Sequence, residues 1–471
     1  MTNPLRRFVL ASAFALPFAS FIAQPVTADH KALSFEVHRD LRTAIEADYD
    51  NHLSDLFVWF HKHAELSGKE IKTAARLAKE FRGLGFEVTE GVGGTGIVAV
   101  LENGEGPRVL MRADMDGLPV MEASGLPYAS ENKQETDLGA IVPVMHACGH
   151  DTHITALVGA ARQLIARKDE WRGTVVLIGQ PAEETVQGAK NMLADGLYER
   201  FGVPDYAIGF HVAANGPAGK VGLKSGLLLS SVDSVDITVR GIGAHGASPH
   251  QGKDPIYMAA QIIMGLQGII SREISPLEPG VITVGSIHGG NKHNIISDRV
   301  DLQLTVRSDN DDVRNRLLEG IKRVAENIGR VNGMPEDLLP VVKWGEEFTY
   351  TTDNAPEETA RVLSALKTNM GEDRLYEIVR LGMGGEDFPF FTKTEHKVPG
   401  VFMFVGGTAE ETLEAAKEGK ATVASHHSPF FKIDPDAAVP TGTEAMVVAA
   451  MELLARPASR KTAPETNADG D

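Results

Sequence analysis

The chain has 471 residues, too many for one ordinary hydrophobic core, so its length predicts two domains. Apolar residues make up 42% of it, a normal share for a soluble globular protein. The formal net charge of -18, with no basic cluster to offset it, argues against nucleic acid or an anionic membrane surface as a partner.

The N-terminus, residues 1–28, has the pattern of a secretory signal peptide. Two arginines form a short basic region, an apolar run covers residues 8–23, and small side chains follow at residues 26–28. A membrane anchor is the alternative, but the run is short for a span and Pro17 interrupts it. We therefore expect an exported protein, periplasmic or secreted, with no membrane attachment after cleavage.

Helical and extended patterns alternate through residues 29–218. The predicted elements are a helix over residues 45–65, a helix over 70–84, strands over 86–88, 96–101 and 109–111, a helix after His153, and strands over 173–178 and 206–211. Strands that alternate with helices predict a largely parallel α/β sheet.

The pattern changes near residue 219. The predicted elements from there are a strand over residues 234–240, a helix over 255–270, strands over 281–287 and 299–307, and a helix over 313–328. This order predicts a small α+β domain inserted over residues 219–340. The α/β domain resumes over residues 341–456, and residues 457–471 are polar enough to be disordered.

Cys148 and His150 belong to the densest group of metal-type residues, residues 145–153, immediately before a predicted helix. Thiolate and imidazole are good ligands for zinc, cobalt, nickel or manganese ions. Gly149 permits the tight bend that lets the two side chains converge. Because Cys148 is the only cysteine, an internal disulfide is excluded, and its surroundings favour a chemical role over a buried apolar filler.

Glu183 and Glu184 directly follow the predicted strand over residues 173–178. Ligands gather at the carboxyl ends of strands in open α/β sheets. One carboxylate can bind a metal ion while the other takes a proton from water and passes it to a leaving nitrogen. A solvated acidic loop is the alternative interpretation.

Weaker signals occur elsewhere. A lone histidine that ends a strand is usually a core residue, paired histidines in a loop usually lie on the surface, and a glycine-flanked histidine usually shapes a turn. Carboxylates that end a strand can orient ligand histidines. The positions concerned are His211, His426 with His427, Asp116 within residues 112–117, His245 within residues 241–246, and the acidic pair within residues 384–388.

Five of these segments occur in the order typical of one protein family. They are Met145-His-Ala-Cys-Gly-His-Asp151, Gln180-Pro-Ala-Glu-Glu184, Phe210-His-Val212, Gly243-Ala-His-Gly246 and His427-Ser-Pro-Phe-Phe431. Together they resemble the M20 metallopeptidase family, most closely the amidohydrolase branch with hippurate hydrolases, N-acyl-amino-acid deacetylases and plant auxin-conjugate hydrolases. The resemblance covers roughly residues 50–455.

The resemblance implies roles for individual residues. Glu183 matches the general base. Asp116 is also predicted as a catalytic residue, on the separate ground that a carboxylate at a strand end can orient a ligand histidine. His245 matches a histidine that stabilises the oxyanion in the neighbouring subunit. Asn294 and Arg307 fall where related members contact the substrate carboxylate. The positions that match the metal ligands are Cys148, His150, Glu184, His211 and His427.

Three departures from the family pattern matter. Ala64 replaces a proline in the segment over residues 61–67, which loosens a helix end. His426 beside His427 creates a choice of ligand, and the register of the following residues favours His427. An early histidine ligand of more distant members is absent, which fits a replacement by Cys148.

The implied fold is an α/β catalytic domain interrupted by a ferredoxin-like α+β lid and dimerisation domain, in a homodimer or homotetramer. The implied activity is hydrolysis of the amide bond of N-acyl amino acids or related small amides, with two divalent ions (Zn, Mn, Co or Ni) per subunit. A dipeptidase or carboxypeptidase with the same centre is the alternative. A non-catalytic metal- or ligand-binding periplasmic protein is disfavoured, because binding alone needs no spare base.

Overall fold

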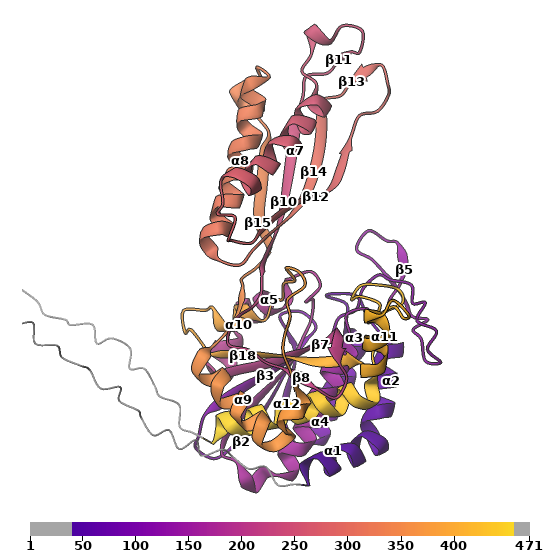
Figure 1. The fold of residues 1–471 in the computed structure, drawn as a ribbon, viewed down its shortest axis with the longest axis vertical. Helices are drawn as coiled ribbons and strands as arrows, with labels where there is room; N and C mark the ends of the chain where they lie inside the picture. Colours follow the sequence, from indigo (N-terminus) through magenta and orange to yellow (C-terminus); the bar gives the residue numbers. More distant parts are fainter. Residues whose placement is uncertain (1–39, 456–471) are drawn as a thin grey trace, which may run out of the picture. The chain divides into compact units, whose positions relative to one another are not determined.

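The computed structural model describes residues 40–455. The predicted signal peptide and C-terminal tail lie outside this range. An eight-stranded mixed sheet forms the larger part (Figure 1), in the order β1-β2-β6-β3-β7-β18-β8-β17. Its strands are β1 (Glu87–Val92), β2 (Gly96–Asn103), β6 (Gly173–Gln180), β3 (Arg108–Asp114), β7 (Tyr206–Pro217), β18 (Gly400–Thr408), β8 (Val221–Gly222) and β17 (Leu375–Tyr376).

The four central strands β6, β3, β7 and β18 are parallel to one another, whereas β2 joins β6 and β8 joins β18 in antiparallel pairs. Alternating residues of β3 face opposite sides: Val109 and Met111 belong to one apolar core and Leu110 to another. Both faces are therefore covered, as a central parallel sheet requires. The predicted α/β sheet is confirmed.

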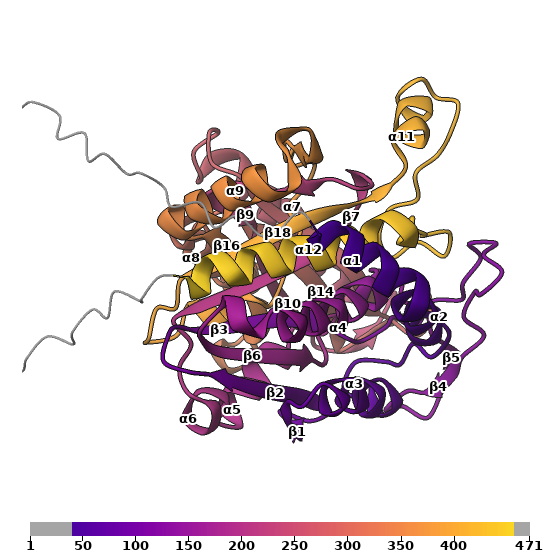
Figure 2. The same cartoon turned by 90° about the horizontal axis from the view of Figure 1, so that it is seen from below.

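Helices α4 (His150–Ala166) and α12 (Pro435–Leu454) lie side by side on one face of this sheet (Figure 2). Within the described range, α12 alone is long and apolar enough to cross a membrane, but 94% of its apolar window is buried inside the protein. Such all-round hydrophobicity suits a central core helix. The other helices of this part are α1 (Leu41–Asp48), α2 (Ser54–Lys62), α3 (Ile71–Gly83), α5 (Gly188–Ala194), α6 (Leu197–Phe201), α9 (Pro356–Met370), α10 (Pro389–Thr392) and α11 (Glu410–Lys417).

A second, four-stranded antiparallel sheet has the order β12-β14-β10-β15 and its own apolar core with two helices. In chain order this part is β10 (Ser231–Arg240), α7 (Pro255–Arg272), β12 (Gly280–Gly289), β14 (Arg299–Ser308), α8 (Asp311–Val331) and β15 (Val341–Thr349). A βαββαβ order with these pairings is the ferredoxin-like arrangement. The sequence predicted the first five of these elements and missed β15, so the sheet runs past the predicted boundary at residue 340.

The small sheet joins the rest of the chain through a two-stranded ribbon. β9 (Gly226–Leu229) precedes β10, β16 (Thr352–Asn354) follows β15, and the two pair in antiparallel fashion. Both connections therefore leave the small sheet at the end where Val232 pairs with Thr349. A further pair, β11 (Ala244–His245) with β13 (Ile295–Ile296), follows the opposite end of β10.

Candidate metal centre

The centre is built where parallel strands end. β3 ends at Asp114, β6 ends at Gln180 just before Glu183, and β7 carries His211. Helix α4 begins at His150 after Gly149, which has a φ of +85°. A Cβ on Gly149 would meet Val212 Cγ1 at 2.4 Å, so only glycine fits there. The strand ends and the helix start thus deliver their polar side chains to one place.

Two groups of three potential ligand atoms share the thiol of Cys148. Cys148, His150 and His211 form the first group, and Cys148, Glu184 and His427 form the second; within each, the ligand atoms lie within 4.8 Å of one another. The Sγ of Cys148 lies 3.3 Å from His211 Nε2, and Glu184 Oε2 lies 3.4 Å from His427 Nε2. The five residues predicted as ligands are therefore brought together, with Cys148 at the junction.

The hydrogen bonds of the two buried histidines separate their roles. His150 Nδ1 donates to the Asp116 backbone carbonyl at 2.9 Å, and its Nε2 has no hydrogen-bond partner among the described residues. His153 has both nitrogens engaged, Nδ1 with Asp114 Oδ1 at 2.5 Å and Nε2 with the Val212 amide at 2.8 Å. His150 can therefore bind a metal ion, whereas His153 holds Asp114.

The electrostatics of the centre suit a bound cation. Burial raises the pKa of the Cys148 thiol well above its usual value, and nearby Glu184 and Glu183 raise it further. Burial would lower the pKa of His150, but Asp114 and Asp116 raise it to about 10. A divalent ion reverses both effects, since it favours the thiolate and the neutral imidazole. Together with the unpartnered Nε2 of His150, this donor set fits divalent metal ions.

Glu183 is a buried carboxylate beside the potential metal ligands, placed where it can act as a base. Its Oε2 lies 3.9 Å from His150 Nε2, and burial together with Glu386 raises its pKa well above the usual value. The loop that carries it is held in shape by left-handed backbone at Ala182 (φ +50°) and by the bond from the Val186 amide to the Glu183 carbonyl. Such strain is typical of residues held in place for function.

Asp116 positions its neighbours. Its Oδ2 accepts from Ser67 Oγ at 2.6 Å and from the Glu184 amide at 3.0 Å, while its Oδ1 lies 3.2 Å from His150 Nδ1. One carboxylate thus ties a histidine of the first group to the loop of the second, which is the orienting role predicted for it.

The choice between His426 and His427 has a geometric basis. His426 Nε2 lies 2.9 Å from the Val212 carbonyl, so it donates there, and burial lowers its pKa to about 3. His427 lies in the second group of potential ligands, with a left-handed backbone (φ +66°) and its amide bonded to the Ala147 carbonyl. The geometry therefore places His427, and not His426, at the centre.

The remaining predicted site residues lie in the small domain, outside both groups of potential ligands. His245 is exposed and accepts from the Ala247 amide through Nδ1, and Asn294 bonds through its carbonyl to the Gly246 amide. Arg307 lies near the hinge, by which we mean the ribbon of β9 and β16, and donates to the Met383 carbonyl at 2.9 Å. His245 and Asn294 are thus neighbours of each other, and Arg307 lies at the other end of the sheet.

Arg112 was not predicted to take part, although it anchors the centre. It is fully buried and donates to Asp114, Gln180, Glu386 and Asp387. Glu386 and Asp387 form a further acidic group with Glu183. The sequence signal was a strand-end arginine and a glycine-flanked acidic pair, but their pairing spans more than 270 positions and is visible only in three dimensions.

Comparison with known proteins agrees with the metal centre described above. Residues 110–452 match the family described as peptidase family M20/M25/M40. Thermostable carboxypeptidase 2 of Saccharolobus solfataricus is 36% identical over 80% of this chain and 89% of its own length. Hippurate hydrolase of Campylobacter jejuni is 36% identical over 70% of this chain and 82% of its own.

Among solved structures, the YXEP protein of Bacillus subtilis, described as a dinuclear metal-binding peptidase of the M20 family, is 28% identical. It superposes with a TM-score of 0.66 over 87% of this chain and 99% of its own. The fold, the paired groups of potential ligands and these similarities agree. The chain belongs to peptidase family M20/M25/M40 and is a metal-dependent amidohydrolase of that family.

Proposed function

We propose that the protein hydrolyses the amide bond of N-acyl amino acids or closely related small amides. The observation that carries this proposal is the pair of ligand groups sharing Cys148, with the buried carboxylate of Glu183 beside them. Divalent ions held by Cys148, His150, Glu184, His211 and His427 would supply a Lewis acid for the amide carbonyl and acidify the attacking water.

The chain's own residues then move the proton. The carboxylate of Glu183 accepts it from the attacking water and returns it to the departing nitrogen. Burial and the neighbouring Glu386 raise the pKa of this carboxyl well above its usual value, and strongly shifted pKa values are typical of catalytic acids and bases. Asp116 keeps His150 and the Glu184 backbone in register throughout.

A reconstitution screen tests this function. The full chain is loaded in turn with zinc, manganese, cobalt and nickel and assayed on a panel of N-acyl amino acids and dipeptides. Glu183→Gln is the matched control and should keep its metal content while turnover falls by about 10²–10⁴-fold. Near-normal turnover in Glu183→Gln would show that another group activates the water.

A dipeptidase or carboxypeptidase is the second candidate, because relatives of comparable similarity carry the name carboxypeptidase. The same screen separates the two. Preference for N-acyl amino acids over dipeptides supports the amidohydrolase, and the reverse preference supports the peptidase.

His245 is proposed to stabilise the oxyanion in the partner subunit of a homodimer or homotetramer. β10 spans ten residues, or about 30 Å at roughly 3.3 Å per residue, and His245 follows the end opposite the hinge. This separation supports action on a neighbouring subunit's centre. Arg307, at the hinge, is proposed to contact the substrate carboxylate from the same subunit, and Asn294 of the partner subunit, beside His245, is proposed to contact it from across the interface.

We propose that the protein is exported after cleavage near residue 28. The basic start, the apolar run and the small residues of the N-terminus support this. The test is the N-terminal sequence of the protein purified from its native cells, together with fractionation of those cells. Recovery of an intact N-terminus in the cytosol would contradict export.

A further inference from the structure

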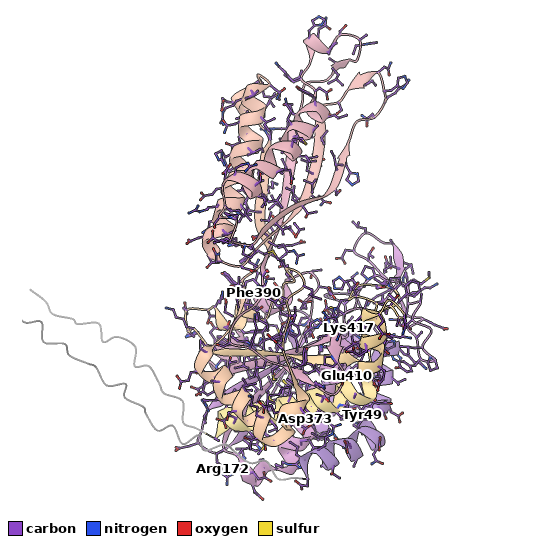
Figure 3. The ribbon with its side chains drawn as sticks, viewed as in Figure 1. Tyr49, Arg172, Asp373, Phe390, Glu410 and Lys417 are labelled. Carbon is purple, nitrogen blue, oxygen red and sulfur yellow. The ribbon has the colours of Figure 1, made fainter. Side chains whose placement is uncertain are left out.

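A cavity of about 840 Å³ lies beside the metal centre, and the proposed chemistry does not use it. Its walls come from residues 376–384, from β7 beyond His211, and from α11 with the loop that leads to His426. Glu410 and Lys417 mark the two ends of α11 in Figure 3. The volume falls within the ~300–1,000 Å³ typical of small-molecule sites.

The cavity lies next to His211, one of the potential metal ligands, and two lining residues show this. Phe404 lines it and pairs with His211 across the parallel strands β18 and β7, so both side chains leave the sheet on the same side. His426 also lines it, with its ring centroid 5.2 Å from that of His211. The cavity is therefore near enough to the centre for a substituent of a bound substrate to extend into it.

The lining of the cavity is largely apolar, and part of it is exposed to solvent. Leu228, Phe404 and Leu413 contribute to the wall. Val379 and Leu381 belong to the same wall and are 67% and 80% exposed. Removing large apolar side chains from water lowers the free energy of the system. An alkyl or aryl group that covers these side chains would therefore bind in the cavity.

The charges around the cavity indicate which end of a substrate it accepts. Both basic side chains that line it already face a carboxylate: Arg380 makes two bonds to Asp309, at 2.8 and 2.9 Å, and Lys417 lies 2.8 Å from Glu414. Glu377 and Glu410 add negative charge to the lining. The carboxylate of an amino acid is therefore disfavoured, whereas an uncharged acyl chain is not.

We propose that this cavity receives the acyl group of the substrate and selects medium-length alkyl or aryl acyl chains over acetyl. The inference rests on the proposed amide hydrolysis and adds the substrate class to it. The segment that carries α11 becomes the part of the chain that sets acyl specificity.

The test compares acetyl, butyryl, hexanoyl and octanoyl derivatives of one amino acid with the metal-loaded, full-length enzyme. Each methylene that enters the cavity should raise kcat/KM by up to about fourfold, until the cavity is filled. Ala416→Trp fills the cavity, and Ala415→Trp is the matched control, because Ala415 lies outside the lining and neither alanine is buried.

Ala416→Trp should lower kcat/KM for the octanoyl substrate at least about tenfold. It should leave kcat/KM for the acetyl substrate within about twofold of the unaltered enzyme. Ala415→Trp should leave both unchanged. Leu381→Ser, at an exposed position, should weaken the chain-length preference without affecting the acetyl substrate.

Equal losses on acetyl and octanoyl substrates, or a flat length series in the unaltered enzyme, would overturn the cavity assignment while hydrolysis of the acetyl substrate upholds the proposed function. Failure to cleave any N-acyl amino acid would overturn both.

Discussion

At the scale of single residues, Cys148 joins two groups of potential metal ligands, one with His150 and His211 and the other with Glu184 and His427. A thiolate is a good ligand for soft or borderline metals, whereas a hydroxyl is a much poorer one. Cys148 is the only cysteine of the chain, and its place at this junction explains its presence.

We expect Cys148→Ser to lower metal content as well as activity, because Cys148 belongs to two groups of potential ligands. Elemental analysis of the purified variant against the unaltered protein measures it. Cys148→Ala is the control for side-chain size and should lose at least as much metal. An unchanged stoichiometry in both variants would remove Cys148 from the ligand set.

Arg112 is the second residue for which we make a prediction, in this case a loss of stability. It is the buried counter-charge of Asp114, Glu386 and Asp387, so Arg112→Met would leave these carboxylates uncompensated. Breaking a buried pair from one side costs about 3–5 kcal/mol. Urea unfolding should show that loss, while Arg323→Met, which breaks an exposed pair with Glu273, should change stability by at most about 1 kcal/mol.

At the scale of elements, the start of α4 decides whether the centre forms. His150 is the first residue of the helix, and the left-handed Gly149 sets the direction from which the helix leaves Cys148. The close contact between this glycine and Val212 also locks α4 against β7, which carries His211. One backbone turn therefore aligns ligands that come from two different elements.

We predict that Gly149→Ala lowers both stability and metal content. Left-handed backbone alone costs an alanine about 1–2 kcal/mol, and the contact with Val212 adds to it. Gly68→Ala is the matched control, since Gly68 has a φ of +73° but nothing within 4 Å of an added Cβ. Thermal unfolding and metal analysis of the two variants separate the effect of backbone strain from the effect of the steric contact with Val212. Equal behaviour of the two variants would contradict the prediction.

The elements also show how far sequence patterns reach. The buried strands and the ligand-bearing segments were predictable because apolar runs and metal-type residues are local. β15 was missed because it is an edge strand with mostly exposed residues, including Lys343, Glu346 and Glu347, so no apolar alternation marks it. The predicted helix over residues 45–65 contains a π-helical turn at Tyr49–Leu53, which ordinary periodicity does not reveal.

At the scale of the whole molecule, the centre and His245 belong to different domains. The domain built on the large sheet supplies every ligand of the two groups that share Cys148, whereas His245 follows the far end of β10 from the hinge. The pairing of Arg112 with Glu386 and the proposed action of His245 on a partner share one property. Both depend on contacts between distant parts of the chain, or between chains, that no local pattern encodes.

If His245 acts on a partner subunit, His245→Ala and Glu183→Gln should complement each other. Each homodimer would be nearly inactive, but a mixed dimer contains one site with both changes and one with neither, so kcat should return toward half. Purified, doubly tagged heterodimer is compared with both homodimers. A verified heterodimer that stays inactive would contradict the action of His245 on the partner subunit. A monomer in light scattering would contradict the oligomer on which that action depends.

The paired strands β9 and β16 have a consequence for how such a protein can arise. Leu229 and Thr352 face each other in register, so the chain leaves for the small domain and returns from it at neighbouring points. A short hairpin turn could close the same ribbon. Such adjacent ends are where domain insertions are tolerated. In evolutionary terms, the small domain is a module: it can be acquired, exchanged or lost at a single hairpin while the strand order of the large sheet stays the same.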